Sequence, residues 1–423
     1  MKLLLIAPSW IDPELNRNSG FSFLPPLSLG ILAALTPPDW EVRILDQNFE
    51  RVDYDYPADL VGITLLTGLA PRAYAMADRF RAQGRKVVLG GIHATALPEE
   101  AAQHADSVVV GEAENLWPQV VSDLLAGSLR PVYRADARPD LAHWVRPRRE
   151  LFPSRGFWLT TATQTTRGCP FRCNFCSVTQ FFGHTYRFRP VPDVVDEVAG
   201  MGSRLVGFLD DNIVGNTRRA KELFRALIPL RIRWMSQGSL TMAEDEELLT
   251  LAERSGCIGM FVGLESINPA ALASLGKPIN IVSRYEAAIK RLHDHGIAVE
   301  GAFMFGLDED DESVFERTLD FARQVRLELA QFAVLTPFPG TPLYSQMDAA
   351  GRIIDRDWGN YNARDVVFRP KGMAPERLKE GVDWSWREFY SLPSTLRQLG
   401  LWRRHLPCLW GLNLAFRRSL VEA

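Results

Sequence analysis

Apolar runs and amphipathic segments alternate along the first 130 residues of the chain. The apolar runs are 2–8, 42–46, 60–66, 86–91 and 107–112, and the segments with helical spacing are 27–35, 71–84 and 116–127. Strands that are apolar along their whole length and are separated by helices predict a parallel sheet covered on both faces. Ligands of such sheets bind at the carboxyl ends of the strands. We therefore predict an α/β domain over residues 1–130.

A second alternating series follows a stretch rich in Pro, Arg and Asp, residues 131–156, which is typical of a linker. Strands are predicted near 159–167, 204–210, 233–237, 258–264, 298–305 and 329–336, with helices between them such as 216–228, 283–295 and 312–325. Six strand–helix units are fewer than a closed barrel needs. Residues 157–345 are therefore predicted to form an open, partial (βα)6 barrel, and residues 346–423 a helical carboxyl-terminal region.

Composition and charge narrow the class of protein. The formal net charge is −3, which gives no indication of nucleic-acid binding. The first ten residues, MKLLLIAPSW, contain a short apolar run with no small-residue cleavage site after it, so a buried first strand is a better interpretation than a signal peptide. No run approaches the roughly 18–20 apolar residues of a membrane-spanning helix. We expect a cytoplasmic protein.

Three of the five cysteines lie close together in the motif RGCPFRCNFCSV, residues 167–178. A secreted disulfide framework would instead spread an even number of cysteines along a short chain. Three thiolates on one loop, Cys169, Cys173 and Cys176, can each bind one iron of a [4Fe–4S] cubane and leave the fourth iron open to an exchangeable ligand. Gly168 and Pro170 suit a loop that wraps tightly around such a cluster.

The alternatives for this motif are a structural zinc site and three unrelated core cysteines. Zinc normally has four protein ligands arranged in pairs, and the only further candidate nearby is His184. The other two cysteines, Cys257 and Cys408, are too scattered to hold a second cubane. Cys257 is expected to be a small buried side chain at the start of a strand.

The cysteine motif resembles the signature of the radical S-adenosylmethionine (SAM) superfamily, in which an aromatic residue, here Phe175, precedes the last cysteine. The resemblance continues at the predicted strand ends, in FLDDN (208–212), WMSQGS (234–239), FVGLES (261–266), GAFMFGLDEDD (301–311) and LTPFPGTPLY (335–344). It implies that SAM is contacted by Asp210, Asp211, Gln237, Glu265, Ser266, Gly301 and Phe305. For Asp210 and Glu265, a rim carboxylate satisfied by a neighbouring residue is an equally good interpretation.

The chemistry of that superfamily depends on the open iron. This iron chelates SAM, and an electron from a low-potential donor of the flavodoxin or ferredoxin type then enters the cluster. The resulting 5′-deoxyadenosyl radical abstracts a hydrogen atom from an unactivated carbon. The cofactor carries the difficult chemistry, while the protein orients it and excludes water.

The amino-terminal domain resembles the cobalamin-binding domain of class B radical SAM enzymes, a Rossmann-like fold of the flavodoxin type. The matching stretches are LPPLSLGILAA (24–34), GIT (62–64), VVLGGIHATALPEEA (87–101) and VVVGEAE (108–114). The resemblance implies cobalamin contacts from Ser28, Thr64, Thr67, Gly90, Gly91, His93, Gly111 and Glu112. Glycines at strand ends would let the backbone approach a large flat ligand.

The chain departs from cobalamin mutases and methionine synthase, whose D-x-H-x-x-G motif supplies a histidine ligand to cobalt. The loop after the first predicted strand, PSWIDPELNRNSG, contains no histidine, so we expect no nitrogen ligand from it and a cobalt that faces the barrel. His93 is the nearest other donor. The alternative for the domain is a Rossmann-like scaffold that binds no cobalamin; a dinucleotide site is disfavoured because no G-x-G-x-x-G follows the first strand.

The end of the chain combines aromatic residues with arginines. The residues are Trp384, Trp386, Phe389, Tyr390, Trp402 and Trp410, interleaved with Arg397, Arg403, Arg404, Arg417 and Arg418. One interpretation is helices packed over the barrel mouth with solvated arginines. The other is an interfacial surface for a lipid-like substrate, with peripheral contact to the inner face of a membrane, because aromatic and basic residues favour the headgroup region.

Together these features predict a cobalamin-dependent radical SAM C-methyltransferase that acts on a small-molecule or lipid-like substrate. One alternative is a cobalamin-associated radical oxidoreductase, cyclase or C–C coupling enzyme acting on a lipid or a tetrapyrrole-like substrate. A non-catalytic alternative is an iron–sulphur redox-sensing module. The SAM-pocket stretches argue against a sensor, because a sensor needs no adenosine pocket.

Overall fold

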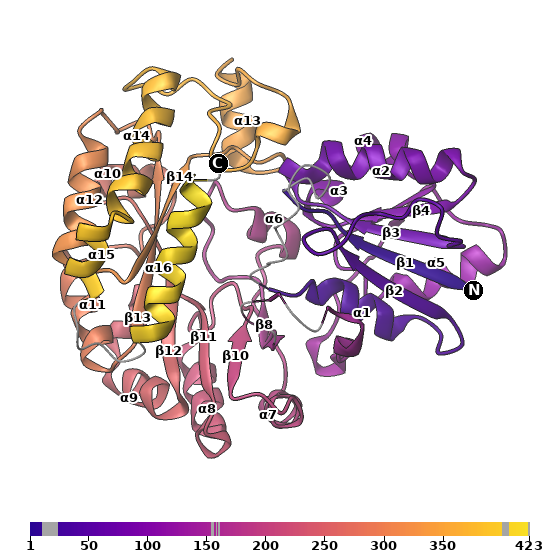
Figure 1. Cartoon of the computed structure of the whole chain (residues 1–423), viewed down its shortest axis with the longest axis horizontal. Coiled ribbons are helices and arrows are strands. Elements are labelled where there is room, and N and C mark those ends of the chain that lie inside the picture. The colour runs from indigo at the N-terminus through magenta and orange to yellow at the C-terminus, as the bar shows by residue number, and fades with distance from the viewer. Residues whose placement is uncertain (11–23, 154–155, 158, 160, 400–405, 422–423) are drawn as a thin grey trace.

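The computed structural model describes residues 1–10, 24–153, 156–157, 159, 161–399 and 406–421. Two parallel six-stranded sheets lie side by side, each with its own helices (Figure 1). The amino-terminal sheet is on the right of the view, and the barrel with the carboxyl-terminal helices is on the left. The α/β architecture predicted from the alternation of apolar and amphipathic segments is confirmed.

The first sheet has the strand order β2-β1-β3-β4-β5-β6. Its strands are β1 (Lys2–Ala7), β2 (Glu41–Asp46), β3 (Leu60–Thr64), β4 (Lys86–Gly90), β5 (Ser107–Val110) and β6 (Val132–Arg134). Its helices are α1 (Leu27–Leu35), α2 (Ala70–Ala82), α3 (Ile92–Ala96), α4 (Pro98–His104) and α5 (Trp117–Leu125). The order 2-1-3-4-5 of the first five strands is that of flavodoxin-like folds.

Each face of this sheet has a separate apolar core, because successive side chains of a strand point to opposite faces. In β1, Leu4 and Ile6 join the core under α2 and α4. Leu3 and Leu5 join the core under α1 and α5, together with Trp117. A continuous apolar strand is therefore needed to fill both cores, which explains the uninterrupted runs in the sequence.

Strand β6 lies in the segment that we predicted to be a linker. It pairs in parallel with β5, and its central residue Tyr133 is buried while both neighbours are exposed. The Tyr133 hydroxyl donates a hydrogen bond of 2.8 Å to Asp123 of α5. An edge strand of three residues with one buried side chain leaves no periodicity that a sequence pattern can reveal, so the amino-terminal sheet extends beyond residue 130.

The second sheet has the order β14-β13-β12-β11-β10-β7 and forms the predicted partial barrel. Its strands are β7 (Ala162–Thr163), β10 (Leu205–Phe208), β11 (Arg233–Gly238), β12 (Cys257–Glu265), β13 (Ala298–Phe305) and β14 (Leu329–Val334). The helices are α6 (Ser177–Phe182), α7 (Val191–Gly200), α8 (Thr217–Leu227), α9 (Glu246–Ser255), α10 (Pro269–Ser274), α11 (Tyr285–Asp294) and α12 (Val314–Gln324).

The first barrel strand is shorter than predicted. The run near 159–167 divides into β7 and a separate strand, β8 (Thr166–Arg167), which pairs antiparallel with β9 (Arg187–Phe188). The division has a local cause: Asp210 accepts hydrogen bonds from the backbone N–H groups of Thr165 and Thr166, which therefore leave the ladder. The chain turns there toward the cysteine motif.

The two faces of the barrel sheet differ in exposure. In β13, Val299, Phe303 and Phe305 are buried against the outer helices, while Glu300 and Met304 lie on the opposite, inner face and stay partly exposed. The same alternation of buried and partly exposed positions runs through β14. The inner face therefore keeps accessible surface for a ligand.

The carboxyl-terminal helices protect the edge strand β14. They are α13 (Pro342–Ala349), α14 (Pro375–Phe389), α15 (Leu392–Leu399) and α16 (Leu406–Val421). The Tyr390 hydroxyl accepts a hydrogen bond from the N–H of Ala330 and donates one to its carbonyl. Trp386 Nε1 donates a hydrogen bond of 2.6 Å to the carbonyl of Phe332. These contacts cover backbone groups that an exposed edge would leave unpaired.

Aromatic residues near the end of the chain, such as Trp386 and Tyr390, thus pack on the barrel. This agrees with the first of the two interpretations of this region. The predicted helical carboxyl-terminal region is confirmed, with a largely irregular segment, residues 350–374, between α13 and α14. Trp402, Arg403 and Arg404 lie outside the described residues, as does the side chain of Arg418. Among the described residues, no helix is long and apolar enough to cross a membrane.

Candidate functional site

The cysteine loop leaves β8 and ends at the start of α6. Cys169 and Cys173 lie in the loop, and Cys176 is the residue before the first turn of α6. Gly168 has φ +84°, and a Cβ there would lie 2.1 Å from the carbonyl oxygen of Thr185. Only glycine fits this position, so the tight turn expected from the motif is present.

Among the described residues, no three Cys, His, Asp or Glu side chains are placed to hold one metal ion. In a cubane each thiolate binds a different iron. Burial raises the pKa of the Cys169 thiol and raises that of Cys173 to about 11. A bound metal cluster would supply the positive charge that their thiolates need.

Asp210 and Asp211 accept hydrogen bonds from the backbone that leads into the cysteine loop. Besides the two backbone N–H groups, the same oxygen of Asp210 accepts from the hydroxyls of Thr165 and Thr166, at 3.1 and 2.6 Å. Asp211 accepts from the N–H of Gly168 at 2.9 Å. Burial raises the pKa of Asp210 to about 6 and that of Asp211 to about 7. One oxygen of Asp210 is therefore satisfied by its neighbours, whereas its other oxygen, Oδ2, is buried without a hydrogen-bond partner among the described residues. Both interpretations of its position stay open.

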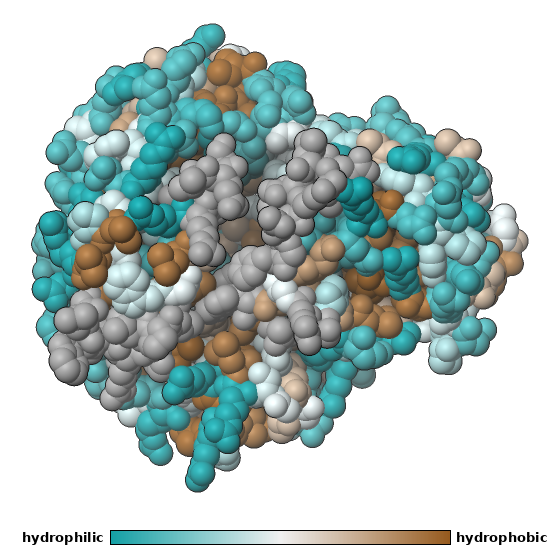
Figure 2. All heavy atoms as spheres, in the orientation of Figure 1, coloured by the Kyte–Doolittle hydropathy of each residue, from teal (hydrophilic) through white to brown (hydrophobic). Residues whose placement is uncertain are grey.

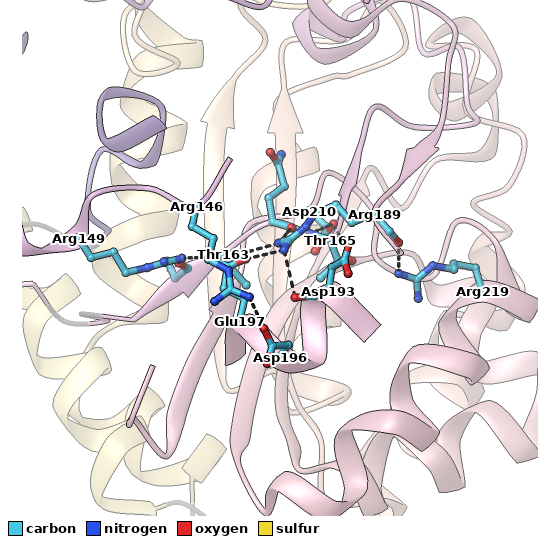
Figure 3. A network of polar contacts seen from close by, with 12 residues as sticks. Arg146, Arg149, Thr163, Thr165, Arg189, Asp193, Asp196, Glu197, Asp210 and Arg219 are labelled. Carbon is cyan, nitrogen blue, oxygen red and sulfur yellow. Dashed lines mark hydrogen bonds and ion pairs between the residues drawn. The ribbon is translucent and has the colours of Figure 1, made fainter. Parts of the chain in front are cut away.

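A network of buried ion pairs lies next to Thr165 and Asp210 (Figure 3). Glu197 of α7 lies between Arg149 and Arg189, with a contact of 2.6 Å to each. Arg189 also donates a hydrogen bond of 2.8 Å to the carbonyl of Gln164, the residue before Thr165. The network fixes the short strand β7 at the open end of the barrel. The sequence gives no signal for it, because its members are far apart along the chain.

At the end of β12, Glu265 has a left-handed backbone, with φ 64°. Its carboxylate pairs with Lys277 at 2.5 Å, and Lys277 also donates to the carbonyl of Gly263 at 2.8 Å. The Ser266 hydroxyl accepts from the N–H of Asn268 at 3.0 Å. A non-glycine residue held in this conformation marks a functional or strained position. Sequence analysis missed Lys277, which adds a cation next to this strand end.

The remaining barrel candidates divide into two groups. Gln237 is exposed near the end of β11, and Phe175 packs partly buried against the barrel core. Gly301 and Phe305 lie in the barrel core. A Cβ at Gly301 would lie 2.7 Å from Leu327, and Phe305 stacks on Phe332 with ring centroids 6.0 Å apart. Core packing accounts for the Phe305 side chain, and the SAM contacts that the resemblance implies for this stretch stay a prediction.

A cavity of about 370 Å³ lies at the carboxyl end of the first sheet. The predicted cobalamin residues that line it are Ser28, Thr64, Gly90, Gly91, Gly111 and Glu112. The cavity is on the face covered by α1 and α5, since Leu29, Val88 and Trp117 belong both to its lining and to the core of that face. It is the ligand position expected for a parallel sheet.

The glycines of the cavity have two distinct roles. Gly91 has φ +106°, and a Cβ there would lie 2.8 Å from the carbonyl oxygen of Leu65, so the backbone itself requires glycine. Among the described residues, the nearest atom to a Cβ added at Gly90 is 3.8 Å away, and none lies within 4 Å of one added at Gly111. These two glycines leave open space that a large ligand can occupy, so the residues present fit a cobalamin.

Two other predicted cobalamin residues do not reach the cavity. His93 is fully buried, and its neighbours Tyr74 and Ala94 belong to the core on the opposite face of the sheet. Its Nε2 lies 3.2 Å from Glu100, and its ring contacts Trp358 edge-on at 5.3 Å. Thr67 is buried in the turn that precedes α2 and is likewise absent from the described lining. Nδ1 of His93 is buried without a hydrogen-bond partner among the described residues, and a cobalamin contact from either residue stays a prediction.

The far wall of the cavity is supplied by the barrel. Gln164, Arg167, Phe181, Phe182 and Leu209 line it, and Arg167 is two residues before the first cluster cysteine. Arg167 forms ion pairs of 2.6 Å with Glu112 and 2.5 Å with Glu114. The cavity therefore adjoins the cysteine loop. The loop after β1, at 11–23, lies outside the described residues.

Comparison with known proteins agrees with this geometry. The Radical SAM superfamily model matches residues 163–322, and the B12 binding domain model matches residues 17–121. Bacteriochlorophyllide d C-12(1)-methyltransferase from Chlorobaculum tepidum is 33% identical over 99% of this chain and 93% of its own length. Bacteriochlorophyllide d C-8(2)-methyltransferase from the same organism is 31% identical over 90% of this chain and 88% of its own length.

The fold is similar to that of a solved structure. The radical S-adenosylmethionine methyltransferase TsrM from Kitasatospora setae, with cobalamin and a [4Fe–4S] cluster bound, superposes with a TM-score of 0.72 at 17% identity, over 100% of this chain and 99% of that one. The cofactors of this chain are thus a [4Fe–4S] cluster, SAM and cobalamin. The chain belongs to the radical SAM superfamily, in the branch that carries an amino-terminal B12-binding domain and includes the bacteriochlorophyllide methyltransferases.

Proposed function

We propose that this enzyme transfers a methyl group from SAM, by way of cobalamin, to an unactivated carbon of a tetrapyrrole-like substrate. The observation that carries the proposal is the shared wall: Arg167 and Gln164 line the cobalamin cavity immediately before the cysteine loop. The cluster with SAM supplies the radical that activates carbon, and the cobalamin supplies the methyl group. The two functions must meet at one substrate carbon, which requires adjacent sites.

The chain's own residues hold and shield these sites. Cys169, Cys173 and Cys176 would bind the cluster, and Asp211 fixes the turn at Gly168 that presents them. Gly90 and Gly111 leave room for the corrin. The inner face of the barrel is largely apolar, with Phe261, Met304 and Ala333 at partly exposed positions. An apolar wall suits a large flat substrate and excludes water from reactive species.

The proposed substrate class rests on relatives that match along nearly their whole length. Both bacteriochlorophyllide methyltransferases are named for methylation of a tetrapyrrole side chain. The alternative reaction is oxidation, cyclisation or C–C coupling of the same kind of substrate. It needs the same cofactors, so the products must distinguish the two.

The test is anaerobic turnover of the reconstituted enzyme with a bacteriochlorophyllide and SAM. Methyl transfer gives S-adenosylhomocysteine and 5′-deoxyadenosine together with a methylated pigment. Formation of 5′-deoxyadenosine with a dehydrogenated or cyclised pigment, and no S-adenosylhomocysteine, would support the alternative. If a bacteriochlorophyllide neither changes nor stimulates SAM cleavage, the tetrapyrrole class should be abandoned.

We also propose a low-potential flavodoxin or ferredoxin as electron donor, and contact with the inner face of a membrane from a cytoplasmic location. Leu392 and Leu396 of α15 are exposed by 48% and 56% and are one helical turn apart, and Arg397 beside them is exposed. Figure 2 shows hydrophobic surface over α15. Apolar and basic side chains on one surface favour an anionic interface.

Co-sedimentation with anionic vesicles tests the membrane contact. The full-length enzyme should sediment at low salt, and the double variant Leu392→Ser/Leu396→Ser should stay in the supernatant. Substituting the exposed Leu125, on the other domain, is the matched control and should change nothing. Equal sedimentation of all three proteins, or of none, would remove the support for a lipid interface.

A further inference from the structure

Arg167 lies where the two cofactor sites meet. Its side chain is buried, with 7% exposed, and its guanidinium contacts Glu112 at 2.6 Å and Glu114 at 2.5 Å. Both glutamates and Arg167 line the cobalamin cavity. Arg167 Nε also donates a hydrogen bond of 3.0 Å to the side chain of Gln164. The planar guanidinium therefore contacts three side chains. A forked guanidinium between two carboxylates has a defined orientation that a lysine could not reproduce.

The pairs connect the two domains. The glutamates follow β5 of the amino-terminal sheet, whereas Arg167 belongs to β8 of the cluster region. Glu112 also pairs with Arg187 of β9 at 2.5 Å. Two arginines from one domain thus balance two glutamates from the other in a buried setting. Removing one partner of such a group leaves an uncompensated buried charge.

On its other side, Arg167 is joined rigidly to the cluster loop. The next residue, Gly168, is held by its N–H bond to Asp211 and precedes Cys169. The guanidinium also lies 5.9 Å from the ring of Phe182, on the helix that begins after Cys176. Any displacement of the guanidinium would therefore be passed to two of the three cluster ligands through covalent and packing contacts.

We infer that Arg167 is a positioning residue that couples occupation of the cobalamin cavity to the geometry and charge environment of the cluster loop. The inference rests on the two cofactor sites and not on the identity of the substrate or on methyl transfer. A ligand in the cavity sets the position of Glu112 and Glu114, and their ion pairs set the position of Arg167. Coupling between two binding sites is reciprocal. The bound cluster must therefore change the affinity for cobalamin by the same factor with which bound cobalamin changes the affinity for the cluster.

The experiment measures both directions of this coupling in the full-length protein. Hydroxocobalamin binding is titrated before and after anaerobic reconstitution of the cluster. Electron paramagnetic resonance spectra of the reduced cluster are recorded with and without hydroxocobalamin. For the unaltered protein we expect a change of about fivefold or more in the dissociation constant, the usual lower range of allosteric coupling, together with a shift of the cluster signal.

In Arg167→Gln the change in dissociation constant should fall below about twofold, and the cluster signal should no longer respond to hydroxocobalamin. Arg167→Lys keeps the charge but not the fork, and should restore part of the response. Arg187→Gln is the matched control, because Arg187 shares Glu112 but is absent from the described lining of the cavity. It should keep the coupling, whereas a role confined to holding the domains together predicts equal loss in both variants.

Two results would overturn the inference: an unaltered protein whose cluster and cobalamin ignore each other, or an Arg167→Gln protein that keeps the full response. If Arg167→Gln fails to fold, Glu114→Gln gives the same test from the other domain, because Glu114 pairs with Arg167 through a separate nitrogen. Its coupling should be reduced, and an unchanged value counts against the inference. Iron content and hydroxocobalamin content establish in each case that both sites are filled.

Discussion

The cluster loop and the cobalamin cavity share one wall, yet the chain builds them in opposite ways. At the cluster, function resides in side chains: three thiols on one loop, with carboxylates beneath them. At the cavity it resides in missing side chains, because Gly90 and Gly111 border space that the described residues leave open. A small cluster needs covalent ligands, whereas a large cofactor needs room and backbone contact.

This difference determines which substitutions are informative. The cluster site is lost when atoms are removed, and the cavity is lost when atoms are added. Each site should therefore be emptied by its own kind of substitution, while the coupling through Arg167 changes the affinity of the other site without emptying it. A variant that empties one site while leaving the other intact would sharpen the comparison, and a variant in which both sites fail together would break it.

The largest effect is expected for Cys169→Ala/Cys173→Ala/Cys176→Ala. The triple variant should contain no cluster chromophore and should form no 5′-deoxyadenosine, because each thiolate binds a separate iron. Iron analysis, absorption spectra and product analysis measure these losses. Hydroxocobalamin should still bind. Retention of cluster iron would show that other residues ligate it, and loss of hydroxocobalamin binding would show that the two sites are not separable.

The reverse substitution is Gly90→Val. The added side chain meets no protein atom closer than 3.8 Å at its Cβ, so the fold should persist while the cavity is obstructed. We expect hydroxocobalamin affinity to fall at least about tenfold, or about 1.4 kcal/mol. Gly200→Val, at a position in α7 with nothing within 4 Å, is the control for adding the same side chain. Equal affinity in both variants would place the corrin elsewhere.

A third prediction concerns the lower face of cobalamin. Since His93 lies on the opposite face of the sheet from the cavity, the cob(II)alamin spectrum should show no nitrogen superhyperfine splitting from an imidazole. His93→Phe should leave that spectrum unchanged. It should lower the free energy of unfolding by about 1–3 kcal/mol, because Glu100 loses a buried partner. An imidazole signal that disappears in this variant would restore His93 as a cobalt ligand.

How far the sequence predicts these sites depends on how local each site is. The cysteine motif and the strand-end glycines are contiguous in sequence, and both were recognisable. Apolar runs likewise predicted eleven of the strands, because each run fills a core. Sequence patterns carry no signal for contacts with a distant partner: His93 with Trp358, Gly301 with Leu327, and the ion pairs of Arg167 with another domain.

Glycines in strands illustrate the limit of prediction from sequence. A glycine in a strand can border open space, as Gly90 does, or make room for a neighbouring core side chain, as Gly301 does, and both look alike in sequence. The outcome depends on which face of the strand the residue occupies. The strand β6 escaped prediction for a related reason, since one buried tyrosine carries no periodicity.

The smallest predicted effect concerns Glu300 on the inner face of the barrel, directly before the stretch that begins at Gly301. Glu300 accepts a hydrogen bond of 2.8 Å from Gln331. Burial raises the pKa of Glu300 to about 6, and this hydrogen bond opposes the rise. Because the folded pKa exceeds the unfolded value, the contribution to stability is fully present below about pH 4.5 and is lost as pH rises through 6.

Glu300→Gln removes the ionisable group while keeping a partner for Gln331. At pH 8 the variant should unfold at a higher temperature than the unaltered protein, with a gain of at most about 2 kcal/mol, since one pKa unit corresponds to roughly 1.4 kcal/mol. At pH 5 the difference should shrink, because the glutamic acid is then largely protonated in the folded protein. Thermal melts of the cluster-free protein at the two pH values measure it. The same difference at both values would mean that the effect of Glu300 comes from packing and not from its charge.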